Sequence, residues 1–186
     1  MEKLIPYKGK LLVSEPHIIG DDSFSRSVVL ITEYNNDGVV GFILNKPLQY
    51  TLDQLIPEIN LELEVFQGGP VDQENLYFLH NIPHLIPGSH LIDDEIYWGG
   101  DFGAVSALIK TGQITGKEIR FFLGYSGWEL DQLENELEGN SWIVCDNKDQ
   151  KELLTLKTRD IWKNHMKTLG GSYQIWSNAP DNPQYN

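Results

Sequence analysis

The chain has 186 residues, 40% of them hydrophobic and 11% aromatic, which fits one globular domain with a single core and excludes a disordered chain. Its 27 acidic residues outnumber 14 Lys and Arg, and the net charge of −13 argues against direct binding to nucleic acid or anionic lipid, which attract clustered cations. We expect a soluble, cytosolic protein for three reasons. The chain has a single cysteine, and no apolar signal-peptide stretch follows Met1. No run approaches the roughly 20 apolar residues that a membrane helix needs.

Predicted strands dominate the first half of the chain. Asn, Asp and Gly in "NNDG" at 35–38 tolerate positive φ, so the strands on either side are expected to form an antiparallel hairpin. Thr51 is expected to cap a short helix that ends at Leu55. The segments with a strand pattern are 10–14, 27–33, 39–45, 61–67, 76–80 and 89–98.

Helices interrupt the second half irregularly. Asp101 is expected to cap a helix that Gly112 closes, and another helix spans about 158–169, with apolar residues at helical spacing. Strands are expected at 118–125 and 142–146, and residues 172–186 as an extended surface tail. Because most strands follow strands, residues 1–186 are predicted to form one α+β domain with a mixed, mostly antiparallel sheet.

The stretch "GYSGWELDQLENELEG" at 124–139 has the pattern of a capped helix. Ser126 and Glu129 have the spacing of a capping box, and Tyr125 and Leu130 that of a hydrophobic staple. Three leucines at helical spacing, Leu130, Leu133 and Leu137, are expected to face the core, and Gly139 to end the helix in the left-handed conformation.

A second stripe on the same predicted helix combines an aromatic with two polar residues, Trp128, Gln132 and Glu136. In one interpretation a second structural layer that includes Trp142 covers Trp128, since large aromatics usually belong to the core. In the other, the stripe is a recognition surface with an aromatic anchor and two polar arms. The sequence leaves both open.

Four ordered segments resemble the YqgE/AlgH family. They are "PHIIGDDSFSRSVVLITE" at 16–33, "GVVGFILNKP" at 38–47, "GGPV" at 68–71 and "GYSGWELDQLENEL" at 124–137. The positions that match the family's motifs are Arg26, Ser27, Asn45, Pro47, Gly68, Gly69, Pro70, Gly124, Gly127, Trp128, Gln132 and Glu136. Four ordered motifs are far more specific than one short pattern.

The resemblance implies a compact α+β fold with a bifurcated, partly barrel-like sheet surrounded by helices. It implies no reaction, and the transcriptional-regulator label of one branch fits an acidic chain poorly where direct DNA contact is concerned. Two positions depart from the family pattern: Tyr34 replaces a frequent His, and Asp131 a frequent Gly. The first departure weakens any site built on that His.

Two groups of reactive side chains have simpler interpretations. His80, His84 and His90, with Asp93 and Asp94, invite a metal site, but Pro83 rules out one regular helix face and no H-E-x-x-H pattern is present, so no metal or cofactor is expected. Cys145 ends an apolar strand beside Asp146, which raises a thiol pKa, so an inert buried thiol is expected. No catalytic residue is therefore assigned.

Arg26, Asn45 and the Gly68–Gly69 pair have two interpretations. Arg26 pairs with Asp21 or Asp22 while Asn45 fixes a turn, or these groups converge with the glycine N–H groups on an anion or peptide carboxylate. We expect a non-enzymatic binding or regulatory protein whose partner, a protein or small molecule, contacts Arg26, Asn45, Gly68, Gly69, Trp128, Gln132 and Glu136. The alternative is an enzyme that acts on a small molecule in a cleft formed by Arg26, Asn45 and Gln132, with His80 as a further candidate.

Overall fold

The structure, a computed structural model, describes residues 4–18, 23–148, 153–155 and 160–179. Its strands are β1 (Leu11–Ser14), β2 (Val28–Asn35), β3 (Gly38–Ile43), β4 (Pro47–Thr51), β5 (Glu64–Gln67), β6 (Val71–His80), β7 (His90–Asp93), β8 (Ile96–Trp98), β9 (Ile119–Trp128) and β10 (Trp142–Cys145). Its helices are α1 (Leu52–Leu55), α2 (Phe102–Lys110), α3 (Leu130–Glu138), α4 (Ile161–Leu169) and α5 (Tyr173–Trp176). The longest of these described helices have nine residues, about half of what a membrane span requires.

The strands form one mixed sheet in the order β10-β1-β2-β3-β9-β6-β8-β7, with β4 and β5 on a branch. The β5–β9 pair is parallel, and every other described pair is antiparallel. This confirms the α+β class and the mostly antiparallel sheet. The sheet is not closed into a barrel: β10 and β7 lie at opposite ends of the order, so the expected partly barrel-like closure is corrected.

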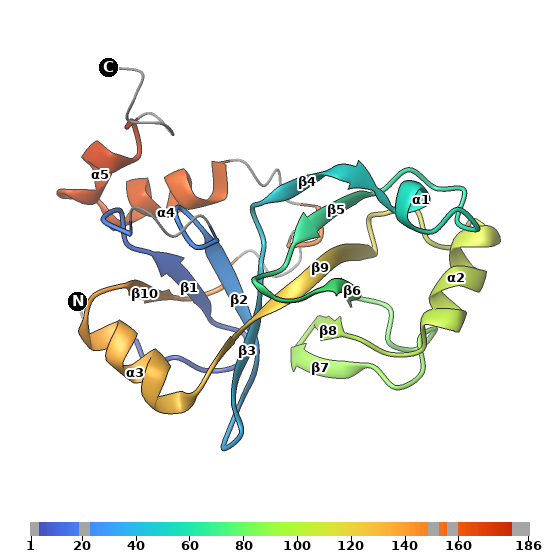
Figure 1. The fold of residues 1–186 in the computed structure, drawn as a ribbon, viewed down its shortest axis with the longest axis horizontal. Coiled ribbons are helices and arrows are strands. Elements are labelled where there is room, and N and C mark those ends of the chain that lie inside the picture. The colour runs from blue at the N-terminus through green and yellow to red at the C-terminus, as the bar shows by residue number, and fades with distance from the viewer. Residues whose placement is uncertain (1–3, 19–22, 149–152, 156–159, 180–186) are drawn as a thin grey trace.

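The sheet divides along β9, the long strand that crosses the centre of Figure 1. Its first half pairs with β5 and β6, while Ser126 and Trp128 near its end pair with β3. Gly124 lies between these two parts with φ +68°. One strand therefore holds the two halves of the molecule together.

Three apolar clusters fill the space between the sheet and its helices. Trp162 and Met166 of α4 pack in one cluster, Val105 and Ile109 of α2 in a second, and Leu133 of α3 with its neighbours in the third. Figure 1 shows α2 beside one half of the sheet and α3 and α4 beside the other. Burial of an apolar stripe of each helix confirms the helical periodicity of the sequence.

The elements that short local sequence signals predict are present in the structure. Asp101 accepts hydrogen bonds from the backbone N–H groups of Gly103 and Ala104, and Gly112 follows α2 with φ +70°. The predicted hairpin is β2–β3. Other segments differ from the prediction. Residues 89–98 form a hairpin of two strands, β4 and the 71–75 part of β6 are strands that the sequence does not predict, and 173–176 of the expected extended tail form the short helix α5. Residues 180–186 of that tail lie outside the described residues.

The predicted capping box before α3 is wrong. Ser126 lies within β9, where its hydroxyl donates to the carbonyl oxygen of Gly68 at 3.0 Å, and Glu129 is the N-cap residue, without a side-chain cap hydrogen bond. The register of Trp128 with Val39 extends β9 three residues beyond the predicted end. The staple of Tyr125 and Leu130 fails with the box, because Tyr125 also lies within the strand.

The end of α3 also differs from the prediction. Gly139 has φ −71°, and Asn140 adopts the left-handed conformation instead, with φ +55°. The leucine stripe is confirmed: Leu133 and Leu137 are buried, and Leu130 is half-buried against the same cluster.

Candidate functional site

Glu136 links two tryptophans under α3. The indole N–H groups of Trp128 and Trp142 donate to its Oε2 at 2.9 and 2.7 Å. Gln132 donates from Nε2 to its other carboxylate oxygen at 2.9 Å. The two indole rings meet edge to face with 5.7 Å between their centroids, and the Phe24 ring packs on both.

Trp128 is therefore part of the core and is only 5% exposed. It is the last residue of β9, not a residue of α3, so it does not share a helical stripe with Gln132 and Glu136. The predicted exposed aromatic anchor is corrected, and the layer that covers Trp128 includes Trp142, as the first interpretation stated. Gln132 remains exposed and Glu136 half-buried.

Arg26 and Asn45 lie together and fasten the chain. The Asn45 side chain accepts from the Val28 N–H at 2.9 Å and donates to the Arg26 carbonyl oxygen at 2.8 Å, and Arg26 has φ +53°. The Arg26 guanidinium lies 5.3 Å from the centroid of the Trp162 ring and donates to the Ala179 carbonyl oxygen at 3.1 Å. The suggested partners of Arg26 at positions 21 and 22 lie outside the described residues.

Gly68 and Gly69 mark a place where two backbone segments cross in near contact. A Cβ at Gly68 would lie 2.1 Å from the Gly124 carbonyl oxygen, and one at Gly69 2.2 Å from the Tyr125 carbonyl. The N–H of Gly68 donates to the Leu123 carbonyl oxygen. That N–H group is thus engaged in the fold.

His80 is fully buried with both ring nitrogens at hydrogen-bonding distance from the backbone. Nε2 lies 3.2 Å from the Gly99 carbonyl oxygen, and Nδ1 accepts from the Ile82 N–H at 3.3 Å. This pattern specifies the neutral Nε2–H tautomer. Burial lowers the pKa of His80 below its ordinary value of 6.5. Within the described ranges no three His, Cys, Asp or Glu side chains gather as metal ligands.

Two other groups titrate abnormally because they are buried. Burial, with a smaller contribution from Asp146, raises the pKa of the Cys145 thiol to about 11. The raised pKa agrees with the predicted inert thiol, but Cys145 is half-buried and not fully buried as predicted. Burial lowers the pKa of Arg120 to about 10, opposed by Glu64, and its guanidinium lies 4.5 Å from the centroid of the Phe66 ring. A thiol of high pKa is a poor nucleophile at neutral pH.

Four surface hollows are described here, and none of them is lined by Arg26, Asn45 or His80. The residues of the enzyme alternative therefore do not meet in one of these hollows. One hollow, the α3 recess, has a volume of about 690 Å³ and is lined by Glu129, Asp131, Gln132, Asn135, Glu136 and Ser141. Another lies beside α2, with a volume of about 350 Å³ and lining that includes Phe78 and Phe102.

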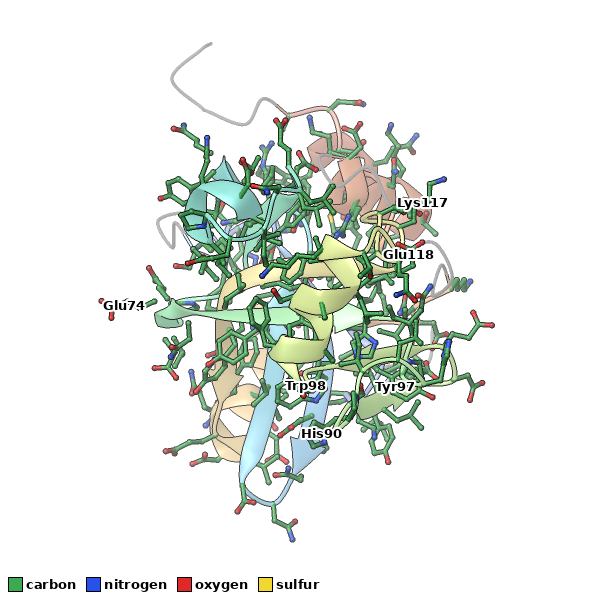
Figure 2. The ribbon with its side chains drawn as sticks, turned by 90° about the vertical axis from the view of Figure 1, so that its right-hand side faces the viewer. Glu74, His90, Tyr97, Trp98, Lys117 and Glu118 are labelled. Carbon is green, nitrogen blue, oxygen red and sulfur yellow. The ribbon has the colours of Figure 1, made fainter. Side chains whose placement is uncertain are left out.

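A third hollow, the aromatic cleft, lies between the two halves of the molecule. It has a volume of about 490 Å³ and is lined by Tyr7, Lys8, Thr32, Glu33, Tyr34, Asn35, Ser89, His90, Leu91 and Trp98. The ring centroids of Tyr7 and Tyr34 lie 6.2 Å apart, and the His90 ring stacks on Trp98 with 5.2 Å between the ring centroids. Figure 2 labels His90 and Trp98 close to the β2–β3 ribbon. The cleft thus combines two aromatic pairs with polar side chains.

The sequence prediction missed this cleft. From the sequence, Tyr34 is only a departure from a family pattern and His90 only a metal candidate, and no motif includes Tyr7 or Trp98. The available signal was the placement of aromatic residues at the ends of predicted strands. That signal is weak, because the three segments of the cleft meet only through the tertiary fold.

The motif residues thus brace a sheet that branches beside Gly124 and carries α3. The family model described as AlgH-like matches residues 11–174. The chain belongs to the AlgH-like family. A UPF0301 protein of Cytophaga hutchinsonii is 42% identical over 181 residues, which are 96% of this chain and 98% of the relative.

Further proteins are similar to the AlgH-like chain over nearly its whole length. A UPF0301 protein of Chlorobium limicola is 38% identical and covers 100% of this chain and 97% of its own. The solution structure of the AlgH protein from Pseudomonas aeruginosa has a TM-score of 0.70 at 26% identity and covers 98% of this chain and 100% of that one. A crystal structure from Corynebacterium diphtheriae, at 22% identity and TM-score 0.74 over 96% and 95% of the two chains, shows the same fold.

Proposed function

We propose that this protein is a non-catalytic, cytosolic binding protein whose small-molecule site is the aromatic cleft. One observation carries the proposal: the N-terminal segment, β2 and the β7–β8 hairpin bring two aromatic pairs and several polar groups to one hollow. Its volume of about 490 Å³ falls in the range of about 300–1,000 Å³ that is typical of ligand sites. The single cysteine, which cannot form an intrachain disulfide, motivates the cytosolic location.

The chemistry of the cleft favours binding over catalysis. Ser89 and His90 are neighbours, but the Ser89 hydroxyl donates to the Ile86 carbonyl oxygen at 2.6 Å, and the His90 ring stacks on Trp98. A nucleophile and its base require a hydrogen bond to each other. Glu33 is the one carboxylate among the lining residues, so a carboxylate pair for general acid and base catalysis is not assembled there.

A second candidate function uses the α3 recess to bind a protein partner. The recess carries the exposed Gln132 and the half-buried Glu136, and three carboxylates line it. Its rigid floor is the observation in favour, because Trp128 and Trp142 fix the Glu136 carboxylate. A partner with a cationic surface fits this recess, since complementary charges steer association.

Native mass spectrometry of the protein purified from its own cells tests the small-molecule site. We expect an adduct of small-molecule mass on the wild type and on His84→Ala, whose side chain is exposed and outside the cleft lining. In His90→Ala the occupancy should correspond to an affinity about 2- to 10-fold lower, the value of one aromatic contact. An adduct equally abundant in all three proteins, or none on the wild type, would contradict the proposal.

A further inference from the structure

The aromatic cleft adjoins a fourth hollow, whose lining includes three lysine side chains. This lysine recess has a volume of about 320 Å³ and is lined by Lys8, Gly9, Lys10, Asp93, Asp146, Asn147 and Lys148. Lys8 lines both hollows, and its ammonium group donates to the carbonyl oxygen of Leu91, a residue of the aromatic cleft, at 3.0 Å. The two hollows therefore adjoin at Lys8.

We infer that the combined site binds a nucleoside monophosphate, with its planar base in the aromatic cleft and its phosphate in the lysine recess. The inference rests on the proposed small-molecule site and specifies its ligand class. The cleft suits a flat heteroaromatic ring, because two tyrosines from the N-terminal segment and β2 line it together with the His90–Trp98 pair from β7 and β8. Base–aromatic stacking contributes about 1–3 kcal/mol per base and tolerates different bases.

The lysine recess is unusual in this acidic chain. Three of the 14 Lys and Arg residues gather there and outnumber the two aspartates, although the net charge of the protein is −13. Lys10 is paired with Asp146, whereas the hydrogen bond of Lys8 goes to a neutral carbonyl oxygen that does not cancel its charge. Lysine ammonium groups bind phosphate as point charges. A cation would meet these same lysines and is therefore disfavoured at this end.

The position of the lysines relative to the rings matches the two parts of a nucleotide. Lys8 lines both hollows, whereas Lys148 is exposed and lines only the lysine recess. The cleft wall carries polar groups for the base edge, among them Glu33 and the side-chain amide nitrogen of Asn35, whose Oδ1 already accepts from the Asp37 N–H. The neutral parts of the ligand thus face the aromatic cleft and its anionic part faces the lysines.

An NMR titration of the whole chain with adenosine monophosphate, adenosine and inorganic phosphate tests the inference. We expect adenosine monophosphate to shift backbone amide signals of residues 7–10, 32–35 and 89–98, with an affinity about tenfold higher than that of adenosine. The Lys148→Ala variant should reduce this advantage to about threefold. Lys110→Ala, an exposed lysine on α2, should leave it unchanged. The guanosine, cytidine and uridine monophosphates are titrated in the same way, each against its nucleoside.

Each result decides between the inference and the proposed function. Equal binding of nucleoside and nucleotide in the cleft would overturn the phosphate assignment and leave the small-molecule site standing. Signal changes confined to another surface, or a phosphate advantage that Lys148→Ala leaves intact, would overturn the inference. If no nucleotide shifts the cleft signals while a native adduct is lost in His90→Ala, only the inference fails. If neither is seen, both fail.

Discussion

Glu136 is the residue whose role changes most between sequence and structure. It accepts two indole N–H hydrogen bonds and a third bond from Gln132, so its carboxylate is a support for the core. Removal of the carboxylate would leave the indole N–H groups of Trp128 and Trp142 without their acceptor. Hydrogen bonds to charged groups contribute about 1.5–3 kcal/mol each, and abandoned buried donors carry a desolvation cost.

We expect Glu136→Ala to lower the free energy of unfolding by about 2–3 kcal/mol, measured by urea denaturation with tryptophan fluorescence. Glu134→Ala, at an exposed position of the same helix, is the matched control and should change it by less than about 0.5 kcal/mol. Equal stability of the two variants would contradict the bracing role of Glu136.

His80 makes stability depend on pH. Its folded-state pKa is lowered, first by burial, so below pH 6.5 the unfolded chain binds a proton that the folded chain does not. The contribution of neutral His80 to the free energy of unfolding is therefore fully present above its ordinary pKa of 6.5. This contribution falls as the pH decreases from 6.5 toward the lowered pKa. The largest possible slope from one such group is about 1.4 kcal/mol per pH unit.

We expect His80→Gln to flatten this dependence between about pH 7 and pH 5.5, because an amide does not titrate in that range. The measurement is the unfolding free energy of wild type and variant at several pH values, and the slope is compared rather than the absolute stability. Identical slopes would exclude His80 as the titrating group.

At the scale of elements, the crossing at β9 explains three glycines of the motifs, Gly68, Gly69 and Gly124. Gly124 has φ +68°, and a Cβ there would lie 2.6 Å from the Val71 carbonyl oxygen and 2.8 Å from that of Gly69. Positive φ alone costs a non-glycine residue about 1–2 kcal/mol. The backbone contacts add to that cost because neither carbonyl is at the end of a flexible side chain.

Gly124→Ala should therefore lower the unfolding free energy by about 3 kcal/mol or more, or prevent folding. Gly112 offers a matched control, since it has φ +70° but nothing within 4 Å of the added Cβ. Gly112→Ala should cost only about 1–2 kcal/mol. Thermal and urea unfolding of both variants test this, and equal losses would show that strand crossing imposes no steric limit.

Elements whose signals are local could be predicted from the sequence. The α2 cap at Asp101, the left-handed Gly112 and the β2–β3 turn each depend on residues within a few positions. Ser126 misled the prediction because its capping signal competes with the pairing of β9 and β3, whose register joins Trp128 to Val39 across the fold. A non-local hydrogen-bond ladder overrode a local preference.

The candidate site was less predictable than the fold for the same reason. Arg26 and Asn45 lie together, but the contact between them is structural, because the Asn45 side chain donates to the Arg26 carbonyl oxygen. The aromatic cleft joins Tyr7, Tyr34 and Trp98 from three segments, and no single-sequence period relates such positions. The resemblance identified the family; it did not identify the cleft.

At the scale of the whole molecule, the bracing residues and the proposed binding site occupy different places. Residues of the family motifs, among them Asn45, Trp128 and Glu136, brace β9, α3 and the corner at Arg26, whereas the aromatic cleft lies where the N-terminal segment, β2 and β7 meet. A fold braced in this way presents a preformed hollow, which reduces the entropy cost of binding. The central claim is therefore that ligand binding occurs at the cleft, away from the bracing residues.

A crystal structure of the protein purified from its own cells, without added ligand, tests this claim most directly. The account predicts electron density for a flat molecule between Tyr34 and Trp98 that extends toward Lys8, with only solvent in the α3 recess. Density for a bound molecule at the α3 recess or beside Arg26 and Asn45, with only solvent in the aromatic cleft, would contradict it.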